Sequence, residues 1–396
     1  MIRRYLDNAP EAALVALVAA AFLLGGSARA DIASVVLLRP IGVGLAILAI
    51  VWTPATVWQN NRAILGLALG WVGLAALHLV PLPPALWQSL PGRELATTID
   101  AAVGVSQWRP LSLVPWRTLN SLLALCAPLA ALLLTLTLRR ERCLRLVYLL
   151  IVLVVLSAAL GLLQVIGGEG NIFYTYRITN AESAVGLFAN RNHNAVFLAL
   201  GMPLIAAAIS LRAVAAEHVR LVEWGAAGAA MLLIPFILTT QSRAGIVIGL
   251  ICVGLALWVY RSPAETSQSR RPRTQFDPRL AFGALVAVGL VLLTVVFSAT
   301  NAIERLSRFG DADDELRLQI WPPIARLAWE YFPAGSGFGT FVEIYKTGEP
   351  AELLSSRYVN HAHNDWLEVM LTGGLPAMVL LDAVARRLPG ALAEGS

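Results

Sequence analysis

Runs of apolar residues long enough to cross a lipid bilayer recur along most of this chain. A membrane-spanning helix needs about 20 mainly apolar residues. The runs that meet this need are Ala12–Gly26, Ile32–Trp52, Ala63–Leu79, Leu119–Leu138, Leu144–Ile166, Ala195–Leu211, Leu221–Thr240, Gly245–Tyr260, Leu280–Ala299 and Trp366–Val384. The chain is 57% hydrophobic and 14% charged, with a mean hydropathy of +0.68, whereas about a quarter of the residues of soluble proteins are charged. Backbone polar groups in lipid must be bonded internally, and the alternating strands of a barrel are not seen, so we predict an all-α polytopic membrane protein with about ten transmembrane helices.

The distribution of arginine predicts the orientation of these helices. Positive charge near span ends is retained in the cytoplasm. With the N-terminus inside, sixteen arginines face the cytoplasm and seven lie in short outer loops. The first apolar run is followed so closely by others that we treat it as a retained helix and not as a cleaved signal. Arg39 is ambiguous, because it falls inside the second predicted span.

The predicted spans divide the chain into four parts. Residues 1–143 form transmembrane helices 1 to 4 with an outer loop at 81–117, and residues 144–299 form helices 5 to 9. Residues 300–363 form a large periplasmic loop with short helices, and residues 364–396 form a shortened final transmembrane helix and a cytoplasmic tail. Three tryptophans, Trp87, Trp108 and Trp116, predict that the outer loop lies on the membrane interface.

Composition argues against several classes of site. Cys126, Cys143 and Cys252 all fall in or beside predicted spans, so we expect neither a disulfide framework nor a cysteine-rich metal site. The net charge of +5 comes mainly from cytoplasmic arginines. That pattern fits contact with anionic membrane lipids and gives no reason to invoke nucleic acid.

The predicted periplasmic loop contains two recognisable segments. Apolar residues from Glu315 to Trp329 have helical spacing, which predicts an amphipathic helix that Pro322 and Pro323 break or kink. Phe332–Gly339 is rich in glycine but lacks the lysine and the preceding strand of a nucleotide-binding loop. A structural turn is therefore favoured over a phosphate-binding loop.

Two outer-facing arginines are candidate binding residues. Arg191 lies in an asparagine-rich cluster just before a span, and Arg243 lies between two spans that are joined by almost no loop. An arginine at that depth is costly unless it is paired or faces a cavity. Guanidinium groups bind phosphate oxygens with two hydrogen bonds, so the pair suits a lipid-linked diphosphate. The alternative is that each arginine snorkels to lipid headgroups.

A histidine-containing motif precedes the last span and supplies the other candidates. His361, His363, Asn364 and Asp365 lie where the span begins, and Glu368 follows Asp365 by three positions. A carboxylate there could orient a histidine or cap the helix. A metal site is a weaker alternative, because two histidines in one loop lack further ligands. His193, in the Arg191 cluster, is a secondary candidate and reads more simply as a polar residue at a helix start.

These pieces together resemble the O-antigen ligase and polymerase superfamily of bacterial envelopes. The resemblance rests on Arg191 in its asparagine-rich cluster, on Ser242-Arg243-Ala244-Gly245, on the Arg317–Trp321 and glycine-rich segments, and on His363-Asn364 followed by Gly374. It covers residues 144–376. The chain departs from the family pattern at Ala377, where glycine, threonine or tyrosine is common, and in how soon it ends after the histidine motif.

The resemblance implies a multi-pass enzyme of the bacterial inner membrane whose active site faces the periplasm. It would transfer a glycan from an undecaprenyl-diphosphate carrier to an acceptor hydroxyl, as in lipopolysaccharide biosynthesis, with no metal and no other cofactor. Arg191 and Arg243 would bind the diphosphate and His363 would be the general base or would orient the acceptor, while Arg317 is a secondary candidate. Histidine suits this role because its unperturbed pKa is about 6.5.

The acceptor stays open on the sequence alone. The leading hypothesis is an O-antigen-type ligase that transfers to lipid A-core, to protein or to another glycan, and a Wzy-type polysaccharide polymerase uses the same donor chemistry. A small-anion membrane transporter is the alternative of another class. Transporters typically show inverted repeats or broken helices near the bilayer midplane, whereas the polar candidates here gather at one membrane face.

Overall fold

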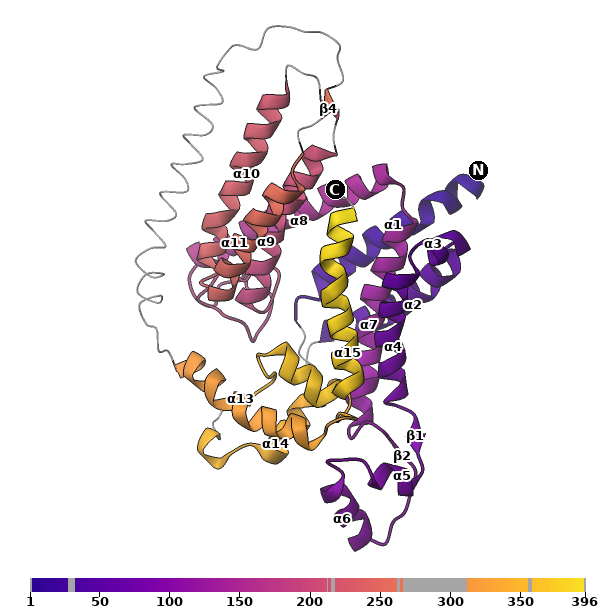
Figure 1. The fold of residues 1–396 in the computed structure, drawn as a ribbon. Coiled ribbons are helices and arrows are strands. Elements are labelled where there is room, and N and C mark those ends of the chain that lie inside the picture. The colour runs from indigo at the N-terminus through magenta and orange to yellow at the C-terminus, as the bar shows by residue number, and fades with distance from the viewer. Residues whose placement is uncertain are drawn as a thin grey trace. The chain divides into compact units, whose positions relative to one another are not determined.

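The computed structural model describes residues 2–27, 33–211, 213–214, 218–261, 264–265, 312–354 and 358–394. Within them, six helices are long and apolar enough to cross a membrane, and three further apolar helices are shorter (Figure 1). The prediction of an all-α polytopic membrane protein is confirmed. The count of about ten spans is not, and the predicted span Leu280–Ala299 lies outside the described residues.

The chain forms two compact units, which we describe separately. The first consists of Met1–Leu38 and Leu138–Phe309. Its helices are α1 (Ile2–Leu24), α8 (Arg140–Ile166), α9 (Arg191–Ser210), α10 (Val219–Thr239) and α11 (Arg243–Val259), and the two-residue strands β3 (Ala213–Val214) and β4 (Ala264–Glu265) pair in parallel.

The second unit consists of Arg39–Thr137 and Gly310–Ser396, and α2 (Ala33–Trp52) leads into it. Its elements are α3 (Ala55–Asn60), α4 (Arg62–Leu77), β1 (Pro81–Leu82), α5 (Pro84–Gln88), α6 (Glu94–Ala102), β2 (Arg109–Pro110), α7 (Pro115–Thr137), α13 (Ala312–Glu330), α14 (Phe341–Gly348), the 3-10 helix η2 (Ala351–Leu353) and α15 (Asp365–Glu394). Strands β1 and β2 pair antiparallel and close the outer loop between α4 and α7. Arg39, the ambiguous arginine, lies within α2, and its Nε donates a hydrogen bond to Asn120 Oδ1 at 3.1 Å.

Helix α9 is the centre of the first unit. It packs against α8, α10 and α11, and the shared core includes Val154, Leu198, Leu233 and Ile237. Gly201 allows the close approach, because a Cβ there would lie 2.7 Å from Leu233 Cδ1. In the bilayer such packing, and not exclusion of water, holds helices together.

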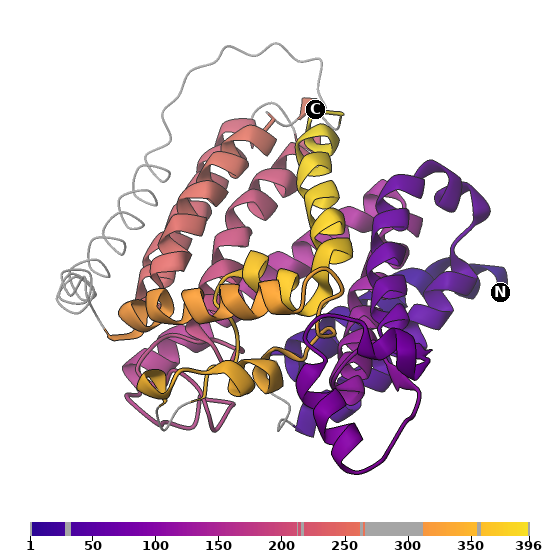
Figure 2. The same ribbon diagram turned by 60° about the horizontal axis from the view of Figure 1, so that its bottom comes forward.

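The second unit has a separate core, formed mainly by helices of the predicted periplasmic loop. Helices α13 and α14 pack with the first turns of α15 (Figure 2). Ile320, Ile324, Phe341 and Leu371 are buried in their shared core. Pro322 and Pro323 were expected to break or kink the amphipathic helix, and they do not break it, because α13 runs through both. Apolar residues on either side of the prolines are buried in this core, and their packing offsets the lost backbone hydrogen bonds.

The glycine-rich turn lies against α15. Its backbone pairs with α15, since Ser336 N donates to Leu371 O and Leu375 N donates to Pro333 O. Gly374, inside α15, has φ 63° and ψ −158°, a conformation open essentially to glycine alone. Helix α15 therefore bends at Gly374, inside the predicted span Trp366–Val384. Its first turns pack on α13, and α15 also packs on α4.

The outer loop at 81–117 has an interior of its own. Trp108 and Trp116 are exposed, but Trp87 is buried, and its Nε1 donates to Pro110 O at 2.8 Å. Trp87 therefore does not lie on a membrane interface as its sequence context suggested. Arg93 is fully buried beside it and donates to Leu111 O and to Gly335 O of the glycine-rich turn. Burial lowers the pKa of Arg93 to about 10, so this residue is charged at neutral pH and fastens the loop to the turn.

Candidate functional site

The two candidate arginines begin two neighbouring helices of the first unit. Arg191 is the first residue of α9, and Arg243 is the first residue of α11. Helix α10 runs between them in the chain, so α9 and α11 start at the same end of the bundle, and the two helices pack closely (Figure 1). The structure thus brings together two residues that lie far apart in the sequence.

Local sequence explains why both helices begin where they do. Asn190 caps α9 by accepting from Asn192 N at 2.8 Å, and Ser242 caps α11 by accepting from Gly245 N at 2.9 Å. These are preferred capping residues. Asn190 of the asparagine-rich cluster is thus the cap of α9, whereas Asn194 of the same cluster is buried below the helix start.

A side-chain hydrogen bond ties the two helix starts together. Ser242 Oγ donates to Asn192 Oδ1 at 2.7 Å. One turn further, a Cβ on Gly245 would collide with the side chain of Ala195. Within Ser242-Arg243-Ala244-Gly245, Ser242 therefore caps α11 and bridges it to α9, and Gly245 lets the two helices pack closely.

This arrangement concentrates positive charge. Each helix N-terminus carries roughly half a positive charge from its macrodipole, and each begins with an arginine. Both arginines are partly exposed. Two aligned N-termini with two guanidinium groups can hold an anion with several oxygens, such as a phosphate or diphosphate.

A buried polar network supports the loop before α9, and sequence reasoning missed it. Gln164 Nε2 donates to Gly186 O, and Gln164 Oε1 accepts from Val185 N and Gly186 N. Ser157 Oγ donates to Asn194 Oδ1, and Asn194 Nδ2 donates to Ala184 O. The signal was present, because polar residues inside an apolar span are rare and usually paired.

The remaining predicted residues belong to the second unit, where Ala362 anchors the histidine motif. Ala362 is fully buried, its N–H donates to Glu368 Oε2 at 3.0 Å, and its carbonyl accepts from Trp321 Nε1 at 3.1 Å. Both flanking histidines, His361 and His363, remain exposed.

In the structure the carboxylate of Glu368 pairs with His361. His361 Nδ1 lies 3.0 Å from Glu368 Oε1. The hydrogen bond to Glu368 is the main reason that the pKa of His361 is raised, against a smaller opposing effect of burial. His363 has φ 51°, an uncommon conformation for a residue with a side chain.

The secondary candidates have simpler positions. Asn364 caps α15, since its Oδ1 accepts from Trp366 N and Leu367 N, and Asp365 is exposed in the first turn. His193 is exposed, with its ring edge-on to Phe188. Arg317 lies in α13. In the part of the chain that the structure describes, no group of three or more His, Cys, Asp or Glu side chains suits a metal ion.

Comparison with known families gives a match over part of the chain. Residues 228–381 match the family model described as O-antigen ligase. Neither curated proteins nor solved structures gave a match. The matched segment includes Arg243, the glycine-rich turn and the histidine motif. This match covers less than half of the chain, and it supports the O-antigen ligase and polymerase superfamily.

Proposed function

We propose that this protein transfers a glycan from an undecaprenyl-diphosphate carrier to an acceptor hydroxyl at the periplasmic face of the bacterial inner membrane. The observation that carries the proposal is the pair of bridged helix N-termini, each beginning with an arginine. The match to the O-antigen ligase family supports a glycan-transfer role of this kind.

The chemistry needs little more than charge and a base. The acceptor oxygen forms a bond to the anomeric carbon of the donor sugar, while the bond from that carbon to the diphosphate oxygen breaks. The leaving diphosphate keeps the electron pair. Arg191 and Arg243 would stabilise its developing charge, and the acceptor proton would pass to a histidine.

We propose His363 as that base or as the group that orients the acceptor. The second candidate is His361, because Glu368 fixes its ring and raises its pKa. A carboxylate that holds one nitrogen of an imidazole and favours the imidazolium is a recurrent device in proton transfer. Separate His361→Gln and His363→Gln variants would assign the base, since loss of only one should abolish transfer at every pH.

The test is the glycan profile of a deletion strain that expresses wild type, Arg243→Lys or Arg220→Lys at equal membrane levels. Arg243→Lys keeps the charge but loses the two-bond geometry, so we expect transfer to fall. Arg220 is exposed near the start of α10, whereas Arg243 follows the other end of that helix. Arg220→Lys should therefore change glycan transfer little.

The accumulated species distinguishes the acceptors. Long polymer left on the lipid carrier indicates a ligase, and single repeat units left on carrier or core indicate a polymerase. An unchanged glycan profile in the deletion strain itself would refute the proposal. A small-anion transporter would then be the next hypothesis to test.

A further inference from the structure

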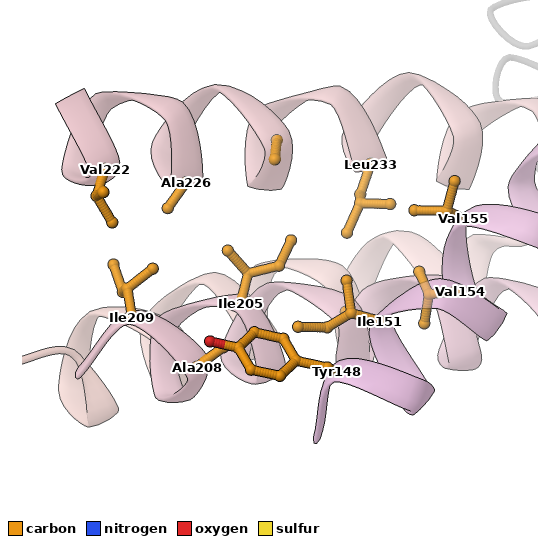
Figure 3. A pocket seen from close by; sticks show the side chains of 12 residues that line it. Tyr148, Ile151, Val154, Val155, Ile205, Ala208, Ile209, Val222, Ala226 and Leu233 are labelled. Carbon is orange, nitrogen blue, oxygen red and sulfur yellow. The ribbon is translucent and has the colours of Figure 1, made fainter. Parts of the chain in front are cut away.

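A partly open apolar cavity of about 310 Å³ lies between α8, α9 and α10 in the first unit (Figure 3). Ile151 and Val154 line it from α8, Ile205 and Ile209 from α9, and Leu233 from α10. The hydroxyl of Tyr148 is the one side-chain polar atom among the lining residues. A space of this character in membrane-spanning helices fits hydrocarbon and not water, because water needs polar partners.

The dimensions of the cavity fit a single lipid chain. At roughly 30 Å³ per methylene-sized unit, the volume corresponds to about ten carbons. The lining residues run from Gly201 to Ile209 on α9, a distance of about 12 Å. Ten bonds of an extended chain also cover about 12 Å, because three bonds advance about 3.5 Å.

Helix α9 connects this groove to the arginine pair. Gly201 follows Arg191 by about 15 Å of helix, and Ile209 follows it by about 27 Å. A chain attached to an anion at the start of α9 and running along that helix reaches the groove and passes through it. An acyl chain of a bilayer phospholipid has about 16 carbons. Anchored at the level of Arg191, it extends about 18 Å and ends within the groove.

We infer that the groove between α8, α9 and α10 holds the isoprenoid chain of the lipid-linked donor, at roughly the fourth to sixth isoprene units from the diphosphate. This inference rests on the proposed function and adds to it a recognition site for the carrier lipid. The undecaprenyl chain, with about 44 main-chain bonds, extends to about 50 Å and spans the distance with length to spare. The groove gives a reason for a long carrier, because a chain of only two or three units would not enter it.

The test uses undecaprenyl diphosphate with a photoreactive diazirine in the fifth isoprene unit and the full-length protein in nanodiscs. Illumination should label peptides of α8, α9 and α10 that line the groove. Excess unlabelled undecaprenyl diphosphate should remove the label, whereas excess farnesyl diphosphate should remove less. Labelling of peptides outside the groove would overturn the inference. Groove labelling that excess undecaprenyl diphosphate does not remove, and that changes only with the bilayer phospholipid, would also overturn it and would assign the groove to an acyl chain.

Two neighbouring residues of α10 supply matched variants. Ala226 lines the groove, and Ala227 is exposed on the same helix and does not line it. Ala226→Phe should reduce groove labelling about tenfold, equivalent to about 1.4 kcal/mol of binding, and Ala227→Phe should leave it unchanged. Equal labelling of both variants would count against the inference.

Transfer measured in the same nanodiscs separates the two claims. If wild type transfers glycan but no label reaches the groove, the groove inference fails and the proposed function stands. If wild type neither binds undecaprenyl diphosphate nor transfers glycan, the proposed function fails and the inference fails with it.

Discussion

The hydrogen bond between Ser242 and Asn192 offers the sharpest test of the candidate site. Ser242→Ala removes two interactions at once. The cap on Gly245 N is lost, at a cost of typically about 1 kcal/mol, and so is the hydrogen bond to Asn192, at a cost of about 0.5–1.5 kcal/mol. We expect the free energy of unfolding to fall by about 2 kcal/mol.

A double-mutant cycle isolates the bridge. Asn192→Ala removes only the hydrogen bond between the helices, so it should cost about 1 kcal/mol. The double variant should be little worse than Ser242→Ala, because the bridge is already gone. The coupling energy should therefore be about 1 kcal/mol, well above the 0.3–0.5 kcal/mol scatter of independent sites.

The assay is reversible unfolding in mixed micelles of mild detergent and sodium dodecyl sulfate, followed by circular dichroism. Binding of undecaprenyl diphosphate should weaken in the same order as the stabilities, since the bridge holds the two N-termini together. Asn192→Ala combined with Ala244→Ser, at an exposed neighbouring position, should be additive. Additive energies for the Ser242 and Asn192 pair would refute the bridge.

Three further predictions follow from the structure. Gly374→Ala should cost about 1–3 kcal/mol in backbone strain, and more because its Cβ would meet Pro333 O. Gly44 lies inside α2 with open space for a Cβ, so Gly44→Ala should not lower the free energy of unfolding and should raise it by about 0.5–1 kcal/mol. Arg243→Lys should raise the dissociation constant for undecaprenyl diphosphate about tenfold, which corresponds to a loss of about 1.4 kcal/mol of binding free energy. An unchanged dissociation constant in a binding titration would contradict bidentate recognition. Glu368→Gln should lower the pKa of His361, which mass spectrometry can follow through pH-dependent carbethoxylation. Since folding raises that pKa, protonated His361 stabilises the wild type at acidic pH, and this contribution is lost as pH rises through the folded-state value. Glu368→Gln should weaken this pH dependence, because the hydrogen bond to Glu368 is the largest cause of the raised pKa.

Most of the fold was predictable because lipid imposes strict rules on sequence. Nine of the ten predicted spans overlap described helices, since about 20 apolar residues in lipid have few alternatives to a helix. Asn190 and Ser242 are residue types that are preferred at helix starts, and both cap helices in the structure. The arginines were recognisable as candidates because charge at span ends is costly.

Other features depended on contacts between distant residues. Pro322 and Pro323 predict a break that core packing on both sides of them overrides. Trp87 predicts an interface position, yet Arg93 and Pro110 enclose it. Local propensity is a weak guide wherever tertiary packing supplies several kcal/mol.

The candidate site likewise has features that the sequence predicts and features that only the structure shows. The sequence by itself determined the class of protein and identified Arg191, Arg243 and the histidine motif as candidates, because hydropathy and charge are local properties. Only the tertiary structure decided that Ser242 bridges to Asn192 and that Glu368 holds His361. Those pairings depend on which helices pack together and at what angle, and neither spacing nor composition specifies that geometry.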